Sequence, residues 1–167
     1  RSLHMRFLTP KDFALKEHQL RSGHISLTFE KDGGARTLRI HRLSMAQMLL
    51  RDRELVEWYP SFFHKDLRDF RPTVSAGRCG QDTVRPQETV RGHDCARIQG
   101  APRSRWRQIL RPLPLVNPRP RRYLEGVVWH CREQNRICVV EHLSKTRLEG
   151  GDDFLEELIA GYVCHAQ

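Results

Sequence analysis

The sequence has no hydrophobic run long enough to cross a membrane. Its densest apolar stretch, Met45 to Leu50, is far shorter than the ~18 apolar residues that a membrane-spanning helix needs. The first residues also lack the apolar core of a secretory signal peptide. These two absences predict a protein of the cytoplasm or nucleus that has no membrane partner.

Motifs typical of several enzyme classes are also missing. The chain contains no nucleotide-binding loop of the G-x-x-x-x-G-K or G-x-G-x-x-G type, no H-E-x-x-H and no G-x-S-x-G. The neighbours His130 and Cys131 cannot form a catalytic dyad on a strand, because adjacent strand residues point to opposite faces. We therefore expect a non-enzymatic protein and assign no catalytic residue.

Cysteines are few and odd in number. They are Cys79, Cys95, Cys131, Cys138 and Cys164. An odd set, scattered through a chain without an export signal, is typical of reduced thiols rather than of a disulfide framework. We expect reduced cysteines in a reducing compartment.

Positive charge is what the chain has in excess. Lys and Arg number 29 against 20 Asp and Glu, which gives a formal net charge of +9. Such an excess favours a polyanionic partner, with nucleic acid first and an acidic protein or an anionic lipid next. A basic surface that serves only solubility is the alternative.

Hydrophobic periodicity predicts an α+β protein whose first part is residues 5–70. A helix is expected from Pro10 to about Arg21, because Thr9 is a good N-cap and Gly23 a good terminator. Alternating residues then predict a hairpin, followed by a helix that starts after Ser44 and stops at Pro60. The strands of this hairpin are residues 24–30 and 36–43.

The last part, residues 121–167, repeats this order of elements. Strands 123–131 and 136–142 are rich in Val, Ile, Trp and Tyr and predict a second hairpin. A helix opens near residues 149–153 and carries an apolar stripe at helical spacing. We therefore expect two antiparallel hairpins, each followed by a helix, that share one core.

Residues 71–120 differ in composition from both of these parts. Seven of the nine prolines lie there, and sustained hydrophobic periodicity is absent. A structureless stretch of this length is uncommon inside a compact domain, so it is interpreted as a linker or a functional arm. We expect a long, irregular, Pro/Arg-rich segment with no central strand between Gly77 and Gly100.

The strongest functional signal is the run from Ala101 to Arg122. It holds Trp106 and seven arginines, with no acid among them: Arg103, Arg105, Arg107, Arg111, Arg119, Arg121 and Arg122. A guanidinium group binds two phosphate oxygens at once and loses its water more easily than an ammonium group. A tryptophan within such a run can stack on an unpaired base. The run predicts nucleic-acid binding by these eight residues, with a solvated spacer as the alternative.

The same segment also suits a protein partner. Residues 112–118 contain Leu113, Leu115 and Val116 between prolines. Extended proline-rich segments are common ligands for grooves on partner proteins. A protein-interaction or adaptor protein is therefore the first alternative to nucleic-acid binding.

The polar face of the first hairpin is a second candidate surface. Strand alternation places together His24, Ser26, Thr28 and Glu30 from one strand and Thr37, Arg39 and His41 from the other. Arginine and histidine on such a face could contact a nucleic-acid backbone or its bases. A merely solvated face is the ordinary interpretation.

Cysteine and histidine also gather on the second hairpin. If Gln134 and Asn135 form a two-residue turn, Cys131 lies opposite Cys138, with His142 on the same face. These three residues suggest a zinc site, although the chain lacks C-x-x-C and a structural site needs four ligands. Two cysteines buried in the core are the alternative.

Acidic residues crowd the start of the last predicted helix. They are Glu149, Asp152, Asp153, Glu156 and Glu157. Pairs spaced four residues apart could hold Mg²⁺, although acids at this position also complement the helix dipole. A metal-dependent nuclease is therefore the third hypothesis, after the nucleic-acid-binding protein and the adaptor.

Overall fold

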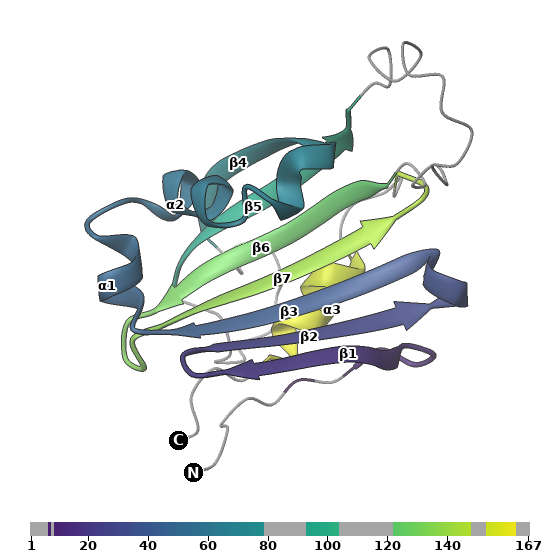
Figure 1. Ribbon diagram of the computed structural model, residues 1–167, viewed down its shortest axis with the longest axis horizontal. Helices are drawn as coiled ribbons and strands as arrows, with labels where there is room; N and C mark the ends of the chain where they lie inside the picture. The colour runs from purple at the N-terminus through teal and green to yellow at the C-terminus, as the bar shows by residue number, and fades with distance from the viewer. Residues whose placement is uncertain (1–6, 8, 79–92, 104–121, 148–152, 163–167) are drawn as a thin grey trace.

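The computed structural model describes residue 7 and residues 9–78, 93–103, 122–147 and 153–162. These residues form one antiparallel sheet (Figure 1) of seven strands: β1 (Ala14–Arg21), β2 (His24–Lys31), β3 (Arg36–Ser44), β4 (Phe70–Arg78), β5 (Asp94–Pro102), β6 (Tyr123–Cys131) and β7 (Arg136–Ser144). Their order across the sheet is β1-β2-β3-β7-β6-β5-β4. Strands β1 to β3 form one meander and β4 to β7 another, and the two meanders join where β3 pairs with β7.

One face of the sheet is covered over strands β4 to β7 by the helix α2 (Leu55–Phe62) and the short 3₁₀ helix η2 (Asp66–Asp69), and we call this side the α2 face (Figure 1). Helix α1 (Ala46–Leu50) lies at the end of the sheet beside the β6–β7 turn, where the backbone nitrogen of Ala46 donates to the carbonyl of Asn135. Trp58 and Tyr59 of α2 are almost fully buried on the α2 face against apolar strand residues that include Ile98, Val128 and Val139.

Helix α3 (Asp153–Ala160) lies on the opposite side, which we call the α3 face. Its Leu155 and Leu158, together with Tyr162, pack against the other set of strand residues, which includes Leu38 and Trp129. Strands β6 and β7 are therefore apolar on both faces, as expected for strands at the centre of a covered sheet. Among the described residues, no helix is long and apolar enough to cross a membrane.

The described helices cover neither face across its full width. On the α2 face, strands β1 to β3 carry mainly polar side chains, most of them at least partly exposed. On the α3 face, exposed polar residues of β4 and β5 include Arg71, Thr73, Ser75 and Gln99, and Arg97 of β5 reaches α3 through an ion pair with Glu156. The described residues thus present two polar strand surfaces, one on each side of the sheet.

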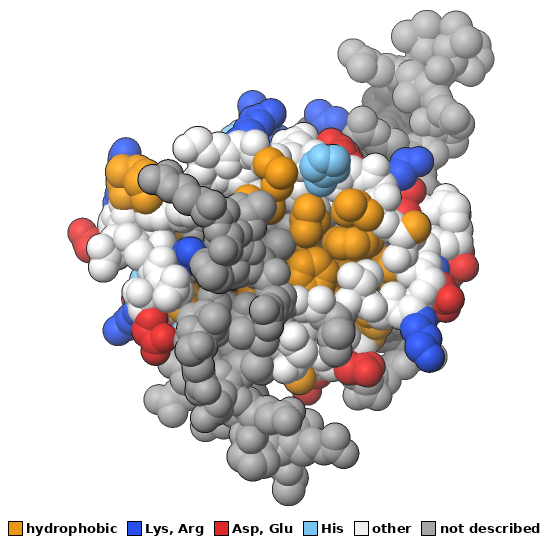
Figure 2. Space-filling model, turned by 90° about the horizontal axis from the view of Figure 1, so that it is seen from below, with side chains coloured by type: hydrophobic (Ala, Val, Ile, Leu, Met, Phe, Trp, Pro, Cys, Tyr) orange, Lys and Arg blue, Asp and Glu red, His pale blue; other side chains and the backbone are white. Residues whose placement is uncertain are grey.

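Strand β1 forms one edge of the sheet and is exposed at all of its residues. Leu15 and Leu20 are two of the exposed large hydrophobic residues of the molecule. Figure 2 views the molecule from the side of this edge and shows hydrophobic side chains gathered in a patch among scattered charges.

The helix predicted from Pro10 to Arg21 is wrong, since Ala14–Arg21 is strand β1. This segment pairs with β2 along its length, with an irregularity between Leu15 and Glu17. Because every residue of β1 is exposed, no apolar stripe is buried that could hold a helix against the core. Local helix signals are weak, and pairing with β2 outweighs them.

The prediction of an irregular segment over residues 71–120 is wrong for the strands β4 and β5. Strand β5 lies inside the sheet between β4 and β6, in the interval where no central strand was expected. Its core-facing positions include the small residues Ala96 and Gly100, which give a weak hydrophobic alternation. A Cβ on Gly100 would lie 3.1 Å from Cβ of Leu124, so close packing explains a small residue there. Pro72 lies in β4, an edge strand, where a missing N–H is tolerated.

The predicted architecture of two hairpins, each followed by a helix, is also wrong. Both hairpins exist, as β2–β3 and β6–β7, but they are the middle of one sheet. Strand β3 pairs with β7 from Arg36 opposite Ser144 to Ser44 opposite Arg136, which satisfies backbone groups that two separate hairpins would leave at open edges. The single helix expected up to Pro60 is instead α1 and α2, which are separated by a turn, and Pro60 lies inside α2.

Candidate functional site

The part of the α2 face that the helices leave uncovered carries a continuous polar surface, which we call the open polar face. It consists of Glu17, Gln19 and Arg21 of β1, His24, Ser26, Thr28 and Glu30 of β2, and Thr37, Arg39 and His41 of β3. Residues directly opposite one another in an antiparallel pair lie on the same face, so the register places these side chains together. The seven from β2 and β3 are those that strand alternation predicted.

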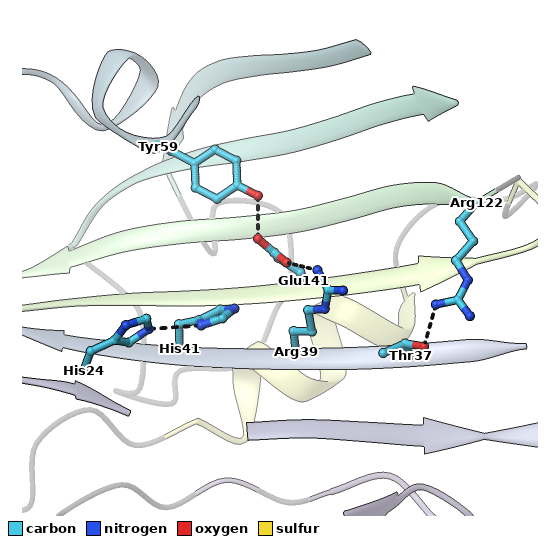
Figure 3. A network of polar contacts seen from close by, with 7 residues as sticks. All are labelled: His24, Thr37, Arg39, His41, Tyr59, Arg122 and Glu141. Atoms are coloured by element: carbon cyan, nitrogen blue, oxygen red, sulfur yellow. Dashed lines mark hydrogen bonds and ion pairs between the residues drawn. The ribbon is translucent and has the colours of Figure 1, made fainter. Parts of the chain in front are cut away.

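Two histidines meet at one end of the open polar face. Nε2 of His24 lies 3.3 Å from Nδ1 of His41 (Figure 3). Burial, together with the smaller effects of His24 and Arg39, lowers the pKa of His41 to about 3. Burial and Arg21 also lower the pKa of His24. Both rings are therefore neutral at neutral pH, where they contribute hydrogen bonding and ring surface rather than charge.

Aromatic side chains of and beside α2 border the same end of the face. The ring of Phe63 lies 5.0 Å from that of His41, and the ring of Phe62 lies 6.3 Å from that of His24, between centroids. Phe62 stacks on Trp58 at 4.8 Å and is still 39% exposed. An exposed ring beside polar strand residues is suited to stacking on an unpaired base.

Arg39 lies in the middle of the face beside a buried carboxylate. Tyr59 donates a hydrogen bond of 2.6 Å to Oε1 of Glu141, and Nη1 of Arg39 lies 3.8 Å from its Oε2 (Figure 3). Burial raises the pKa of Glu141, while the hydrogen bond from Tyr59 and the charge of Arg39 oppose that rise. The Arg39 side chain is 30% exposed, so it compensates the buried acid and still reaches solvent.

Arg122 lies at the other end of the open polar face. Its Nη1 donates to Oγ1 of Thr37 at 3.1 Å, and its Nη2 donates to the carbonyl of Gly34 at 2.8 Å (Figure 3). Gly34 belongs to the turn between β2 and β3 and has a φ of 85°, which favours glycine. The guanidinium group thereby ties the start of β6 to this turn.

Arg103 is the other described member of the predicted nucleic-acid-binding set. Its backbone nitrogen donates to the carbonyl of Asp69 at 3.0 Å, and its Nε donates to the carbonyl of Phe70 at 2.7 Å. Because β5 and β6 are antiparallel neighbours, Arg103 and Arg122 lie at the same end of the sheet. The other six residues of the set, Arg105, Trp106, Arg107, Arg111, Arg119 and Arg121, lie outside the described residues, as do residues 112–118 of the adaptor hypothesis.

The zinc hypothesis assumed a register that the hairpin does not have. Cys131 lies opposite Arg136 rather than Cys138, because residues 132–135 form a four-residue turn. Cys138 and His142 are four residues apart on β7, about 13 Å along an extended strand. In the part of the chain that the structure describes, no group of three or more His, Cys, Asp or Glu residues could hold a metal ion.

Cys131 and Cys138 are buried thiols in the core of the α3 face. The Tyr162 hydroxyl lies 3.6 Å from Sγ of Cys138, and burial raises the pKa of this thiol to about 12. The prediction of reduced cysteines is correct for these two and wrong for Cys95, which is disulfide-bonded. This bond, whose other cysteine lies outside the described residues, weakens the case for a reducing compartment.

The acidic cluster of the nuclease hypothesis is described only in part. Oε1 of Glu156 forms an ion pair with Nη2 of Arg97 at 2.5 Å, which links α3 to β5. Glu157 is exposed, while Glu149, Asp152 and the side chain of Asp153 lie outside the described residues. One carboxylate that a metal would need is thus engaged by an arginine.

Sequence reasoning did not identify Tyr59, Phe62 and Glu141 as neighbours of this surface. A signal for Glu141 exists, because it is an acid inside β7 that directly follows the four apolar residues Ile137–Val140. A buried carboxylate requires compensating partners, which are the hydrogen bond from Tyr59 and the ion pair with Arg39.

The comparisons with protein-family models and with curated proteins found no relative. No family model matches the chain, and no curated protein matches it at a significant level. The geometry of the open polar face and the charge of the chain are therefore the basis for a functional proposal.

Proposed function

We propose that this protein binds nucleic acid without catalysing a reaction on it. The open polar face is one part of the binding surface, and the arginine-rich run that ends at Arg122 is the other. The observation that carries the proposal is the hydrogen bond between Arg122 and Thr37, which joins the end of this run to the open polar face. A bound strand could thus contact both parts at once.

The positive charge of the arginine-rich run and the hydrogen-bond donors of the open polar face are suited to a phosphate backbone. The run from Ala101 to Arg122 carries seven arginines and no acid. On the open polar face, Arg21 and Arg39 stand among the hydroxyl groups of Ser26 and Thr28. Arginine and small hydroxyl side chains make many of the phosphate contacts in nucleic-acid complexes.

Single strands fit this surface better than duplexes. An exposed ring, Phe62, lies beside His24 at one end of the open polar face. Rings of this kind stack on bases that are free of a partner, as in other sheet surfaces that hold single strands. Trp106 of the arginine-rich run adds a second ring.

Fluorescence anisotropy with single- and double-stranded oligonucleotides at several salt concentrations tests the proposal. Each phosphate contact lowers the log–log slope of affinity against salt by about 0.7 on single strands and about 0.9 on duplexes. Three to five contacts would give a slope of roughly −2 to −4.5. Binding should be tighter to single strands.

The triple change Arg105, Arg107 and Arg111 to Ala should flatten the slope and weaken binding to all sequences alike. Arg103 is left intact because its guanidinium group holds the carbonyl of Phe70. A matched control removes three exposed arginines away from the open polar face, Arg36, Arg68 and Arg71. No binding at low salt, or equal losses in both triple variants, would refute the proposal and favour the adaptor.

A further inference from the structure

Two arginines are neighbours on the α3 face at the end of the sheet near the β6–β7 turn. Arg42 of β3 lies opposite Cys138 of β7, and Arg136 of β7 lies opposite Ser44 of β3. The two arginines are therefore diagonal neighbours on adjacent strands, a relation in which long side chains reach one another.

The described residues leave both guanidinium groups only partly satisfied. Arg42 is only 8% exposed, and its buried Nε and Nη1 have no hydrogen-bond partner in the described part of the chain. The same holds for the buried Nη1 of Arg136. A buried N–H group without an acceptor destabilises a fold. Its presence on two neighbouring arginines therefore needs an explanation.

Among the residues that the structure describes, no acid is found to balance the charge of Arg42. The charged and titratable neighbours that act on it are Arg136, Tyr162 and Cys138. Burial raises the pKa of the Cys138 thiol to about 12, so it is neutral at neutral pH, and Arg136 is another cation. Burial, aided by Arg136, accordingly lowers the pKa of Arg42. Two cations thus share a partly desolvated position, an arrangement that an anionic ligand would stabilise.

We infer that Arg42 and Arg136 form a binding site for a phosphate group on the α3 face, separate from the open polar face. Two guanidinium groups match the double negative charge of a phosphate, whereas a carboxylate balances only one of them. The forked N–H groups suit its several oxygens, and the nearby Ser44 offers a hydroxyl group. Arg136 is only half-buried, which gives the ligand a route from solvent.

Arginine side-chain NMR signals of the full chain, titrated with inorganic phosphate at constant ionic strength, test this inference. The Nε–Hε signals of Arg42 and Arg136 should shift saturably, while the signal of the exposed Arg71 on the same face should not. Arg136→Gln should weaken phosphate binding by about tenfold or more, the loss expected for a charge-assisted hydrogen bond. Arg136 is only half-buried, so Arg136→Gln tests the site even if the corresponding change at the buried Arg42, Arg42→Gln, prevents folding.

Two oligonucleotides of one sequence, with and without a terminal phosphate, identify the source of the phosphate. Tighter binding of the phosphorylated strand, abolished by Arg136→Gln, would assign the site to a nucleic-acid end. No difference between the strands, together with saturable binding of inorganic phosphate, would assign it to a small free phosphate. No saturable shift at millimolar phosphate, an equal shift of Arg71, or unchanged affinity in Arg136→Gln would overturn the inference. Arg136→Gln leaves the open polar face intact, so this failure is distinct from failure of nucleic-acid binding there.

Discussion

On the α2 face of this sheet, helices cover strands β4 to β7, whereas none of the described helices covers strands β1 to β3. The covered part presents residues such as Ile98 and Val128, which bury Trp58 and Tyr59. The uncovered part presents Ser26 and Thr28 among charged residues and histidines. The same sheet thus carries a core and a polar surface side by side. Which of the two forms depends on whether the residues of a strand that point to the α2 face are apolar or polar.

The border between the two parts is held by a buried polar network. Tyr59 comes from the covering helix, Glu141 from the central strand and Arg39 from the open polar face. A polar surface kept only for solubility needs no such connection to the core. The network instead fixes the position of Arg39, which is what a binding surface requires.

The largest expected effect on stability comes from truncating a core side chain in the part of the α2 face that the helices cover. Trp58→Ala removes a side chain that is 1% exposed and should lower the free energy of unfolding by about 3–5 kcal/mol. Thr28→Ala, on the open polar face, should change it by no more than about 0.5 kcal/mol. Chemical denaturation of both variants measures the contrast. Similar losses in the two would show that the open polar face is part of the core.

The sequence predicted this contrast only in part, and the reasons are local. Strands β2, β3, β6 and β7 and the polar side of the first hairpin follow from plain alternation of residue types. Strand β1 did not, because an exposed edge strand has no buried pattern to detect. The position of Cys131 opposite Arg136 depends on the length of one turn, and a single-residue change in that length moves every partner. The contact between Arg122 and Thr37 joins residues 85 positions apart, which no local pattern reveals.

Removing the hydroxyl group of Tyr59 tests the buried polar network of Tyr59, Glu141 and Arg39. Tyr59→Phe leaves Glu141 buried without its hydrogen-bond donor and should cost about 1–3 kcal/mol of unfolding free energy. Tyr123→Phe, at a half-buried position outside this network, serves as the control and should be nearly neutral. A neutral Tyr59→Phe would mean that Arg39 alone compensates the carboxylate.

The histidine pair predicts a loss of stability in mild acid. The pKa of His41 is lowered from its ordinary 6.5 to about 3, so the unfolded chain binds a proton there that the folded protein does not. Stability from this residue is therefore full above its unfolded pKa and falls as the pH drops below it. Between about pH 7 and pH 5 the contribution should fall by about 1–2 kcal/mol.

Denaturation of His41→Gln over this pH range measures that contribution. The variant should lose less stability in acid than the parent protein, because glutamine does not titrate. His18→Gln, at an exposed position of β1, should follow the parent protein. Equal acid sensitivity of His41→Gln and the parent would contradict the buried, neutral state of the pair.

The smallest expected effect is that of removing the Phe62 ring, which lies between the covered part of the α2 face and the open polar face. Phe62→Ala should weaken binding to single strands by about 1 kcal/mol, the low end for one stacked base, because Trp58 already covers one side of the ring. Duplex binding should be unchanged. Leu20→Ala removes another exposed apolar side chain, on the other face, and controls for surface change. Anisotropy titrations with both kinds of oligonucleotide separate the two variants.

The most direct test of the account is to map which surface of the sheet a single strand contacts. Backbone NMR signals should be followed while an unmodified oligonucleotide is added to the full chain. The account predicts that Gln19, Ser26 and Thr28 of the open polar face shift with the strand, together with Arg122. Thr73 and Ser75, on the uncovered part of the α3 face, should stay in place. Shifts confined to Thr73 and Ser75, or none on the open polar face while the strand binds, would contradict it.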